Sequence, residues 1–137
     1  MLDFGSGAGF PGMVCGICST NHVYLIDSNK KKISFLKLIK KKLNLENVFV
    51  HHTRIENLRT KEKYDVICSR AVSSLENLLS YTIDFSNPNT RFIFLKGKKV
   101  DKEIIFSKKK WSYNLKQETS ITNKEGKILI IKDLKKK

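Results

Sequence analysis

The stretch LDFGSGAGFPG, residues 2–12, carries four glycines among eleven residues. Leu2 to Phe4 predict a short strand that ends in this glycine turn, and Pro11 suits the first turn of a helix that runs through Cys18. A strand, a glycine-rich turn and a helix in this order are typical of α/β sheets that hold a ligand at the carboxyl ends of their strands. The spacing of the glycines distinguishes the ligands that such a turn can hold.

Two common phosphate-binding loops do not fit this spacing. The dinucleotide fingerprint G-x-G-x-x-G, begun at Gly5 and Gly7, requires a glycine where Phe10 stands. A P-loop that begins at Gly7 has its second glycine at the right interval, but the next residue is methionine instead of the phosphate-binding lysine. The turn is a weak match to the first class and lacks the essential cation of the second.

The pattern that remains is Asp-x-Gly-x-Gly-x-Gly, formed by Asp3, Gly5, Gly7 and Gly9. Glycines let the backbone approach a ligand closely, because a Cβ would occupy the ligand's space. Asp27 closes the next predicted strand about 20 residues further on, where a carboxylate accepts hydrogen bonds from ribose hydroxyls. This pair of acids resembles the S-adenosylmethionine site of Rossmann-like methyltransferases. The alternative is a structural glycine turn without a ligand.

The rest of the chain alternates short apolar runs with amphipathic segments, and it ends in a hairpin pattern. Further strands are predicted at residues 23–27, 48–50, 64–68 and 91–96. Helices are predicted at residues 30–43, from a serine cap at 73 or 74 to 83, and at 100–107. An antiparallel hairpin is expected from residues 111–119 and 127–131. The fold class is therefore α/β, with a mostly parallel sheet and a C-terminal antiparallel hairpin.

The length and charge of the chain indicate its size class and its kind of partner. Its 137 residues suit one domain, expected over residues 1–134, and a solvated basic tail is expected at residues 135–137. Lys and Arg number 27 against 13 Asp and Glu, a formal net charge of +14. A field of this sign attracts phosphate polyanions, which favours a nucleic-acid partner over lysines that only solubilise the chain.

Three cysteines and no secretory signal predict a reducing, cytoplasmic location. Cys15 and Cys18 form a C-x-x-C without a second pair, on what the pattern predicts to be an apolar helix face, so buried side chains are favoured over a zinc or redox site. No apolar run approaches the roughly 18 residues of a membrane span. We expect no metal and no membrane partner.

Several short motifs occur in a fixed order over most of the chain. They are GSGAGFPG from residue 5, LIDSNKKK from residue 25, Arg54-Ile55-Glu56, Ser69-Arg70-Ala71 and Leu95-Lys96-Gly97. Together they resemble the ribosomal RNA small subunit methyltransferase G family, also called the glucose-inhibited division protein B family. The resemblance implies a class I methyltransferase fold with a truncated first strand, and without the helical segment that precedes the glycine motif in the family.

The resemblance also implies the cofactor, S-adenosylmethionine, and most of the residues that contact it. Gly5 and Phe10 match cofactor-contacting positions of the glycine turn, and Ile55 and Glu56 match the pair that flanks the adenine. Arg70 matches an arginine near the methionine end of the cofactor. Three residues are added from their position in the chain: Asp27 for the ribose, with Asp3 and Gly7 lining the turn.

The implied reaction is methyl transfer to N7 of a guanine in bacterial 16S ribosomal RNA. Neutral guanine has a lone pair on N7, so no catalytic residue is assigned, and His22, His51 and His52 are predicted at the surface or at a strand edge. Contacts with RNA phosphates are predicted for lysines that follow two strands, chiefly Lys30, Lys31, Lys96 and Lys98.

The sequence also allows other functions. One is a non-catalytic RNA-binding remnant of such an enzyme, and another is a methyltransferase that acts on a different RNA or on a protein. The expected partner is the small ribosomal subunit, and the expected state is a monomer.

Overall fold

The computed structural model describes residues 1–70 and 72–137. Ala71, which ends the Ser-Arg-Ala motif, lies outside the described residues. The chain divides into two compact units, residues 1–60 and 61–137. The single domain expected over residues 1–134 stays a prediction, and the two units are described in turn.

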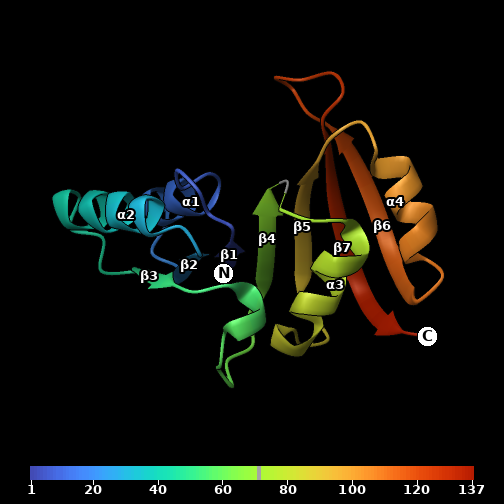
Figure 1. Cartoon of the computed structure of the whole chain (residues 1–137), viewed down its shortest axis with the longest axis horizontal. Helices are drawn as coiled ribbons and strands as arrows, with labels where there is room; N and C mark the ends of the chain where they lie inside the picture. Colours follow the sequence, from blue (N-terminus) through green and yellow to red (C-terminus); the bar gives the residue numbers. More distant parts are fainter. Residues whose placement is uncertain (71) are drawn as a thin grey trace. The chain divides into compact units, whose positions relative to one another are not determined.

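The first unit, described throughout, contains three parallel strands and two helices (Figure 1). β2 pairs with β1 on one side and with β3 on the other, so β3 is an edge strand of this unit. The elements are β1 Leu2–Phe4, α1 Gly12–Cys18, β2 Val23–Asp27, α2 Lys30–Lys42, β3 Val48–His52 and the 3₁₀ helix η1 Ile55–Asn57. The predicted short first strand is confirmed, since β1 has three residues and all of them are buried.

The core of the first unit lies between the strands and the two helices. Its buried members are Met13, Val23, Leu25, Ile33, Leu36 and Val48. The spacing of Ile33 and Leu36 places both on one face of α2, as the amphipathic pattern predicts. The Asn29 side chain accepts a hydrogen bond from the backbone N–H of Lys32 at the start of α2, and Asn44 follows its end with a φ of 50°. The lysines of α2 other than Lys40 are thus exposed to solvent, while Ile33 and Leu36 pack against residues of β2 and β3.

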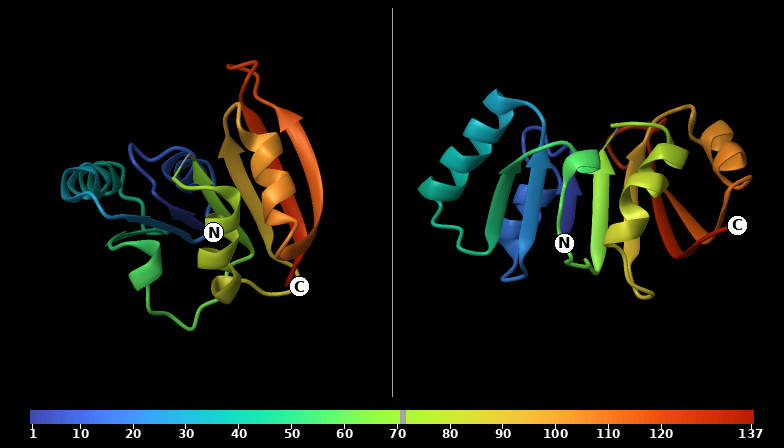
Figure 2. Two further views of the ribbon diagram at one scale, coloured as in Figure 1. Left: turned by 45° about the vertical axis from the view of Figure 1, so that its right-hand side comes forward. Right: turned by 60° about the horizontal axis from the view of Figure 1, so that its bottom comes forward.

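The second unit combines parallel and antiparallel strands (Figure 2). β4 and β5 run parallel, β7 runs antiparallel to β5, and β6 pairs with β7 as a hairpin. The elements are β4 Val66–Arg70, α3 Leu75–Thr82, the 3₁₀ helix η2 Ile83–Phe85, β5 Arg91–Lys96, α4 Val100–Ser107, β6 Trp111–Thr119 and β7 Lys127–Lys136. The predicted α/β class with a C-terminal antiparallel hairpin is confirmed.

Three local predictions need correction. β4 begins at Val66, because the backbone N–H of Tyr64 donates to the carbonyl oxygen of Phe85 in a loop. The basic tail is the end of β7: Lys136 pairs with Trp111, and a strand of polar residues pairs through its backbone without an apolar signal. Cys15 is half-buried and Cys18 is exposed at the end of α1, so neither is the fully buried side chain that the pattern predicts.

Candidate functional site

The glycine turn is fixed to the end of β2 by its own backbone. Gly5, Gly7 and Gly9 have φ values of 67°, 56° and 96°, in the left-handed region that favours glycine. The N–H groups of Gly5 and Ser6 both donate to the carbonyl oxygen of Ile26, at 2.8 and 3.1 Å. The turn therefore bends back over the carboxyl end of the neighbouring strand, where parallel sheets bind their ligands.

The two predicted carboxylates, Asp3 and Asp27, hold this turn from both sides. Asp3 is 1% exposed, and its Oδ2 accepts a hydrogen bond of 2.9 Å from the N–H of Gly12 at the start of α1. Asp27 is 8% exposed; its Oδ2 accepts from Gly7 N–H at 2.9 Å and its Oδ1 from Asn29 N–H at 2.8 Å. A carboxylate has about four lone-pair sites, so Asp27 keeps acceptor capacity for a ribose hydroxyl.

The glycines of this region serve two different purposes. A Cβ at Gly12 would lie 2.3 Å from Leu25 Cδ2, so this position lets α1 approach β2. A Cβ at Gly9 would lie 2.6 Å from Met13 Cβ and 3.1 Å from Leu36 Cδ2, so that position lets the turn pack against α1 and α2. Among the described residues, and its chain neighbours apart, a Cβ at Gly7 would meet only the carbonyl oxygen of Gly5, at 3.9 Å. The space above Gly7 is thus open, and it is the part of the turn that fits a cofactor.

The segment after β3 is tied to the same edge of the sheet. Thr53 N–H donates to the carbonyl oxygen of Asp27 at 3.0 Å, which brings the chain that follows β3 beside the end of β2. Ile55 is 7% exposed in η1, while Glu56 is exposed. The family resemblance indicates this pair, but the sequence does not predict the 3₁₀ helix that contains it, since three residues carry no periodic signal.

Phe10 and Arg70 are exposed residues whose predicted cofactor contacts stay predictions. Phe10 is 54% exposed, in the turn that leads into α1. Arg70 ends β4 in the second unit, and it is exposed while Ser69 before it is buried.

The four predicted RNA-contacting lysines differ in exposure. Lys30 and Lys31 are exposed in the first turn of α2. Lys98 is exposed and pairs with Glu125 at 2.6 Å. The side chain of Lys96 is only 6% exposed, and its Nζ lies 2.8 Å from Glu103 Oε2 and 2.5 Å from the carbonyl oxygen of Ser73. An ammonium held in this way has little surface to offer a phosphate, and its contacts indicate a structural role.

Replacing Lys96 by alanine is therefore expected to lower the free energy of unfolding by about 1–3 kcal/mol, because it leaves the Glu103 carboxylate without its cation. Glu103 Oε2 also accepts from the N–H of Leu75 at 2.7 Å, so the change disturbs the start of α3. Lys98→Ala is the matched control, since its ion pair is exposed and contributes under about 1 kcal/mol. Urea denaturation measures both, and equal losses would contradict the structural role of Lys96.

The thiol of Cys15, in α1, is a titratable group of the first unit outside the candidate site. Burial, and then the charge of Asp3, raise the pKa of the Cys15 thiol, so this residue stays protonated at neutral pH. Across residues 1–70 and 72–137, no group of three or more His, Cys, Asp and Glu side chains is placed to hold a metal ion. Within the same residues, no helix has the length and apolar character needed to cross a bilayer.

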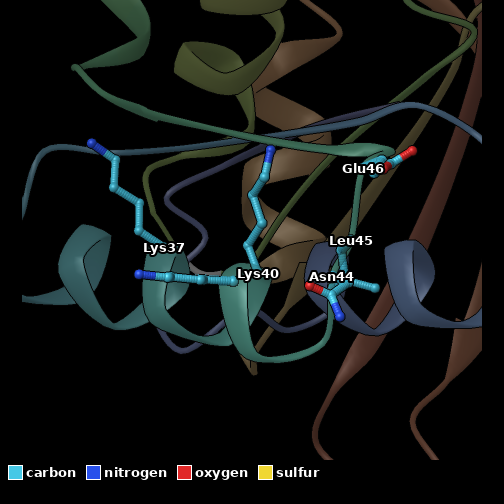
Figure 3. Close-up of a pocket in the computed structure, with 6 residues that line it drawn as sticks. Lys37, Lys40, Asn44, Leu45 and Glu46 are labelled. Atoms are coloured by element: carbon cyan, nitrogen blue, oxygen red, sulfur yellow. The ribbon is translucent and has the colours of Figure 1, made fainter.

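A surface hollow of about 590 Å³ lies in the first unit, beside the second half of α2 and the loop that follows it (Figure 3). Its lining residues are Lys37, Lys40, Lys41, Asn44, Leu45 and Glu46. The Lys40 side chain points from α2 toward β3, where its Nζ lies 2.5 Å from the carbonyl oxygen of Val48 and 5.2 Å from the centre of the Phe49 ring. The hollow contains none of the predicted cofactor residues, and Lys40 serves packing there.

The fold and the turn define a class of protein. An rRNA methylase from Streptococcus thermophilus has a similar structure, with a TM-score of 0.71 and 14% identity, over 98% of this chain and 86% of that one. A methyltransferase from Thiobacillus denitrificans, solved with S-adenosyl-L-homocysteine, has a TM-score of 0.61 and 19% identity, over 69% of this chain and 40% of that one. The chain has the Rossmann-like fold of the class I methyltransferases, whose cofactor is S-adenosylmethionine.

The family follows from the sequence comparison. The profile of the rRNA small subunit methyltransferase G family matches residues 1–132. Ribosomal RNA small subunit methyltransferase G of Mesoplasma florum is 41% identical over an alignment of 129 residues, and the match covers 92% of this chain and 53% of that protein. The chain belongs to the rRNA small subunit methyltransferase G family, as the ordered motifs predict. It spans about half the length of the curated relatives that it matches.

Proposed function

We propose that this chain transfers a methyl group from S-adenosylmethionine to N7 of a guanine in bacterial 16S ribosomal RNA. Family membership supports an rRNA methyltransferase. The observation that carries the proposal is the glycine turn, which is open above Gly7 and held by two buried carboxylates. The proposed location is the cytoplasm, and the proposed state is a monomer acting on the small ribosomal subunit.

In this proposal, different residues of the first unit bind different parts of the cofactor. The main chain at Gly5 and Gly7, with the Phe10 side chain, receives the methionine end. Asp27 binds the ribose, and Ile55 with Glu56 flanks the adenine. Asp3 acts as a positioning residue, because its buried carboxylate ties the turn to α1. Arg70 is proposed, by resemblance to the family, to interact with the methionine end.

The chemistry requires alignment more than proton transfer. S-adenosylmethionine, when bound, supplies an electrophilic methyl group on a sulfonium. Neutral guanine N7 would accept that methyl group through its lone pair, and S-adenosylhomocysteine would leave as the neutral product. No proton leaves N7, so the protein contributes by holding the reacting atoms in line and by excluding water.

The histidines fit a reaction without a general base. His51 and His52 are exposed on the edge strand β3, and the Nε2 of His52 lies 2.9 Å from the carbonyl oxygen of Ser28. Both thus lie at a strand edge, as the sequence predicts.

The proposed function is tested by incubating small ribosomal subunits with S-adenosylmethionine that carries a labelled methyl group. The expected result is label on guanine N7, located by reduction and aniline cleavage of the RNA, with His51→Ala and His52→Ala within about threefold of the wild-type rate because no base is used. Label on another atom would contradict the N7 assignment. Complete loss in either histidine variant, with cofactor binding retained, would contradict the mechanism, and RNA binding without transfer would favour the non-catalytic alternative.

A further inference from the structure

Two lysine runs that are far apart in the sequence meet at one end of the second unit. Lys108 to Lys110 follow α4, and Lys135 to Lys137 lie at the end of β7. The backbone N–H of Lys137 donates to the carbonyl oxygen of Lys110 at 2.9 Å, and its Nζ lies 2.6 Å from the carbonyl oxygen of Lys108. Figures 1 and 2 show the C-terminus beside the loop that joins α4 to β6.

Strand register decides which lysines share a face. Lys136 pairs with Trp111, so both side chains lie on the same face of the sheet. Tyr113, two residues further along β6, lies on that face too, and its hydroxyl is 2.7 Å from Ser107 Oγ of α4. Lys136 is therefore on the α4 side, whereas alternation places Lys135 on the opposite side. We define the lysine cluster as Lys108, Lys109, Lys110, Lys136 and Lys137, all of which are exposed.

An exposed aromatic ring lies beside this cluster. Phe106 is 53% exposed on α4, and the Nζ of Lys109 is 5.2 Å from the centre of its ring. Glu76 is the acid that pairs with Lys110, at 2.5 Å, so the cluster keeps a clear excess of positive charge. Cations that follow a backbone, together with an exposed ring on which a base can stack, are the features that bind single-stranded nucleic acid.

The cluster lies at the amino end of β5, away from Lys96 at the carboxyl end of this strand. Lys127, at the start of β7, pairs with Lys96 at the carboxyl end of β5, so the end of β7 lies toward the amino end of β5. We propose that the lysine cluster and Phe106 form a second contact surface for single-stranded RNA, at the amino end of β5. This inference rests on the proposed function only in taking RNA as the partner.

The matched pair Lys136→Ala and Lys135→Ala tests the proposal, because these neighbours carry the same charge on opposite faces. Binding of a short fluorescein-labelled oligouridylate is measured by anisotropy over a salt series, without cofactor, so failure of methyl transfer does not affect the result. A single phosphate contact contributes about 0.7 to the slope of log affinity against log salt for single strands. Lys136→Ala is expected to lower the slope by about that amount, and Lys108→Ala combined with Lys136→Ala by about twice as much, whereas Lys135→Ala leaves it nearly unchanged.

A second variant tests the ring. Phe106→Leu keeps an apolar side chain on α4 but removes the stacking surface, and it is expected to weaken binding of the oligomer at least about fivefold. Equal slopes for Lys135→Ala and Lys136→Ala, in variants that melt like the wild type, would overturn the proposal. So would unchanged RNA binding by the double variant together with lost binding of polyglutamate, which would show a surface for acidic protein.

Discussion

Replacing Asp27 by asparagine is expected to weaken binding of S-adenosylhomocysteine by about 10- to 100-fold, the equivalent of one charge-assisted hydrogen bond. Each Asp27 oxygen accepts one backbone N–H, from Gly7 and from Asn29. An amide NH₂ group would face one of these donors, so the turn would shift at the position where the cofactor enters. The ribose would also lose its anionic acceptor.

Calorimetric titration of the folded variant measures this effect, and Asp101→Asn is the control. Asp101 undergoes the same chemical change, but it is exposed in the first turn of α4. If both variants bound S-adenosylhomocysteine as tightly as the wild type, Asp27 would have no part in the site. A thermal melt of each variant separates lost binding from lost structure.

Replacing Gly12 by alanine is expected to lower the free energy of unfolding by about 2–3 kcal/mol, as overpacking of a close helix–strand contact does. The new Cβ would lie 2.3 Å from Leu25 Cδ2 and 2.5 Å from Asp3 Oδ2. α1 must then move away from β2, which also strains the hydrogen bond from Gly12 N–H to Asp3. The melting temperature should fall by roughly 5–10 °C for a chain of this size.

Gly97→Ala provides the matched control for this prediction. Among the described residues other than its chain neighbours, none has an atom within 4 Å of a Cβ at Gly97, so the stability of this variant should be unchanged or raised by up to about 1 kcal/mol. Melting curves of the two variants and of the wild type measure these differences in stability. Equal stability of Gly12→Ala and the wild type would contradict the close approach of α1 to β2.

The sequence predicts most elements because their apolar periods are strong. α2 is an example, since Ile33 and Leu36 recur at helical spacing and both prove to be buried. β7 shows the limit: its apolar run stops at Ile131, but its polar continuation pairs through the backbone with β6. Nothing in the residue types of a polar strand end distinguishes it from a solvated tail.

The sequence predicts which residues form the candidate site, but it does not predict what each of them does. The spacing of Asp3, Asp27 and the glycines singles out the turn, and the structure brings these residues together. The spacing does not reveal that Gly12 lets α1 pack closely on β2 while Gly7 leaves open space, because that difference depends on neighbours in the folded chain. Lys96 is a similar case, since only the tertiary structure brings Glu103 to its ammonium.

The central claim is that the glycine turn and the residues after β3 hold the cofactor. Backbone amide NMR of the folded, isotope-labelled chain, titrated with S-adenosylhomocysteine, tests it most directly. The largest shifts are expected at residues 5–10, at Asp27 and at Ile55 and Glu56, with the lysine cluster unaffected. Saturable shifts confined to other residues, or no shifts at all in a folded chain, would contradict the claim.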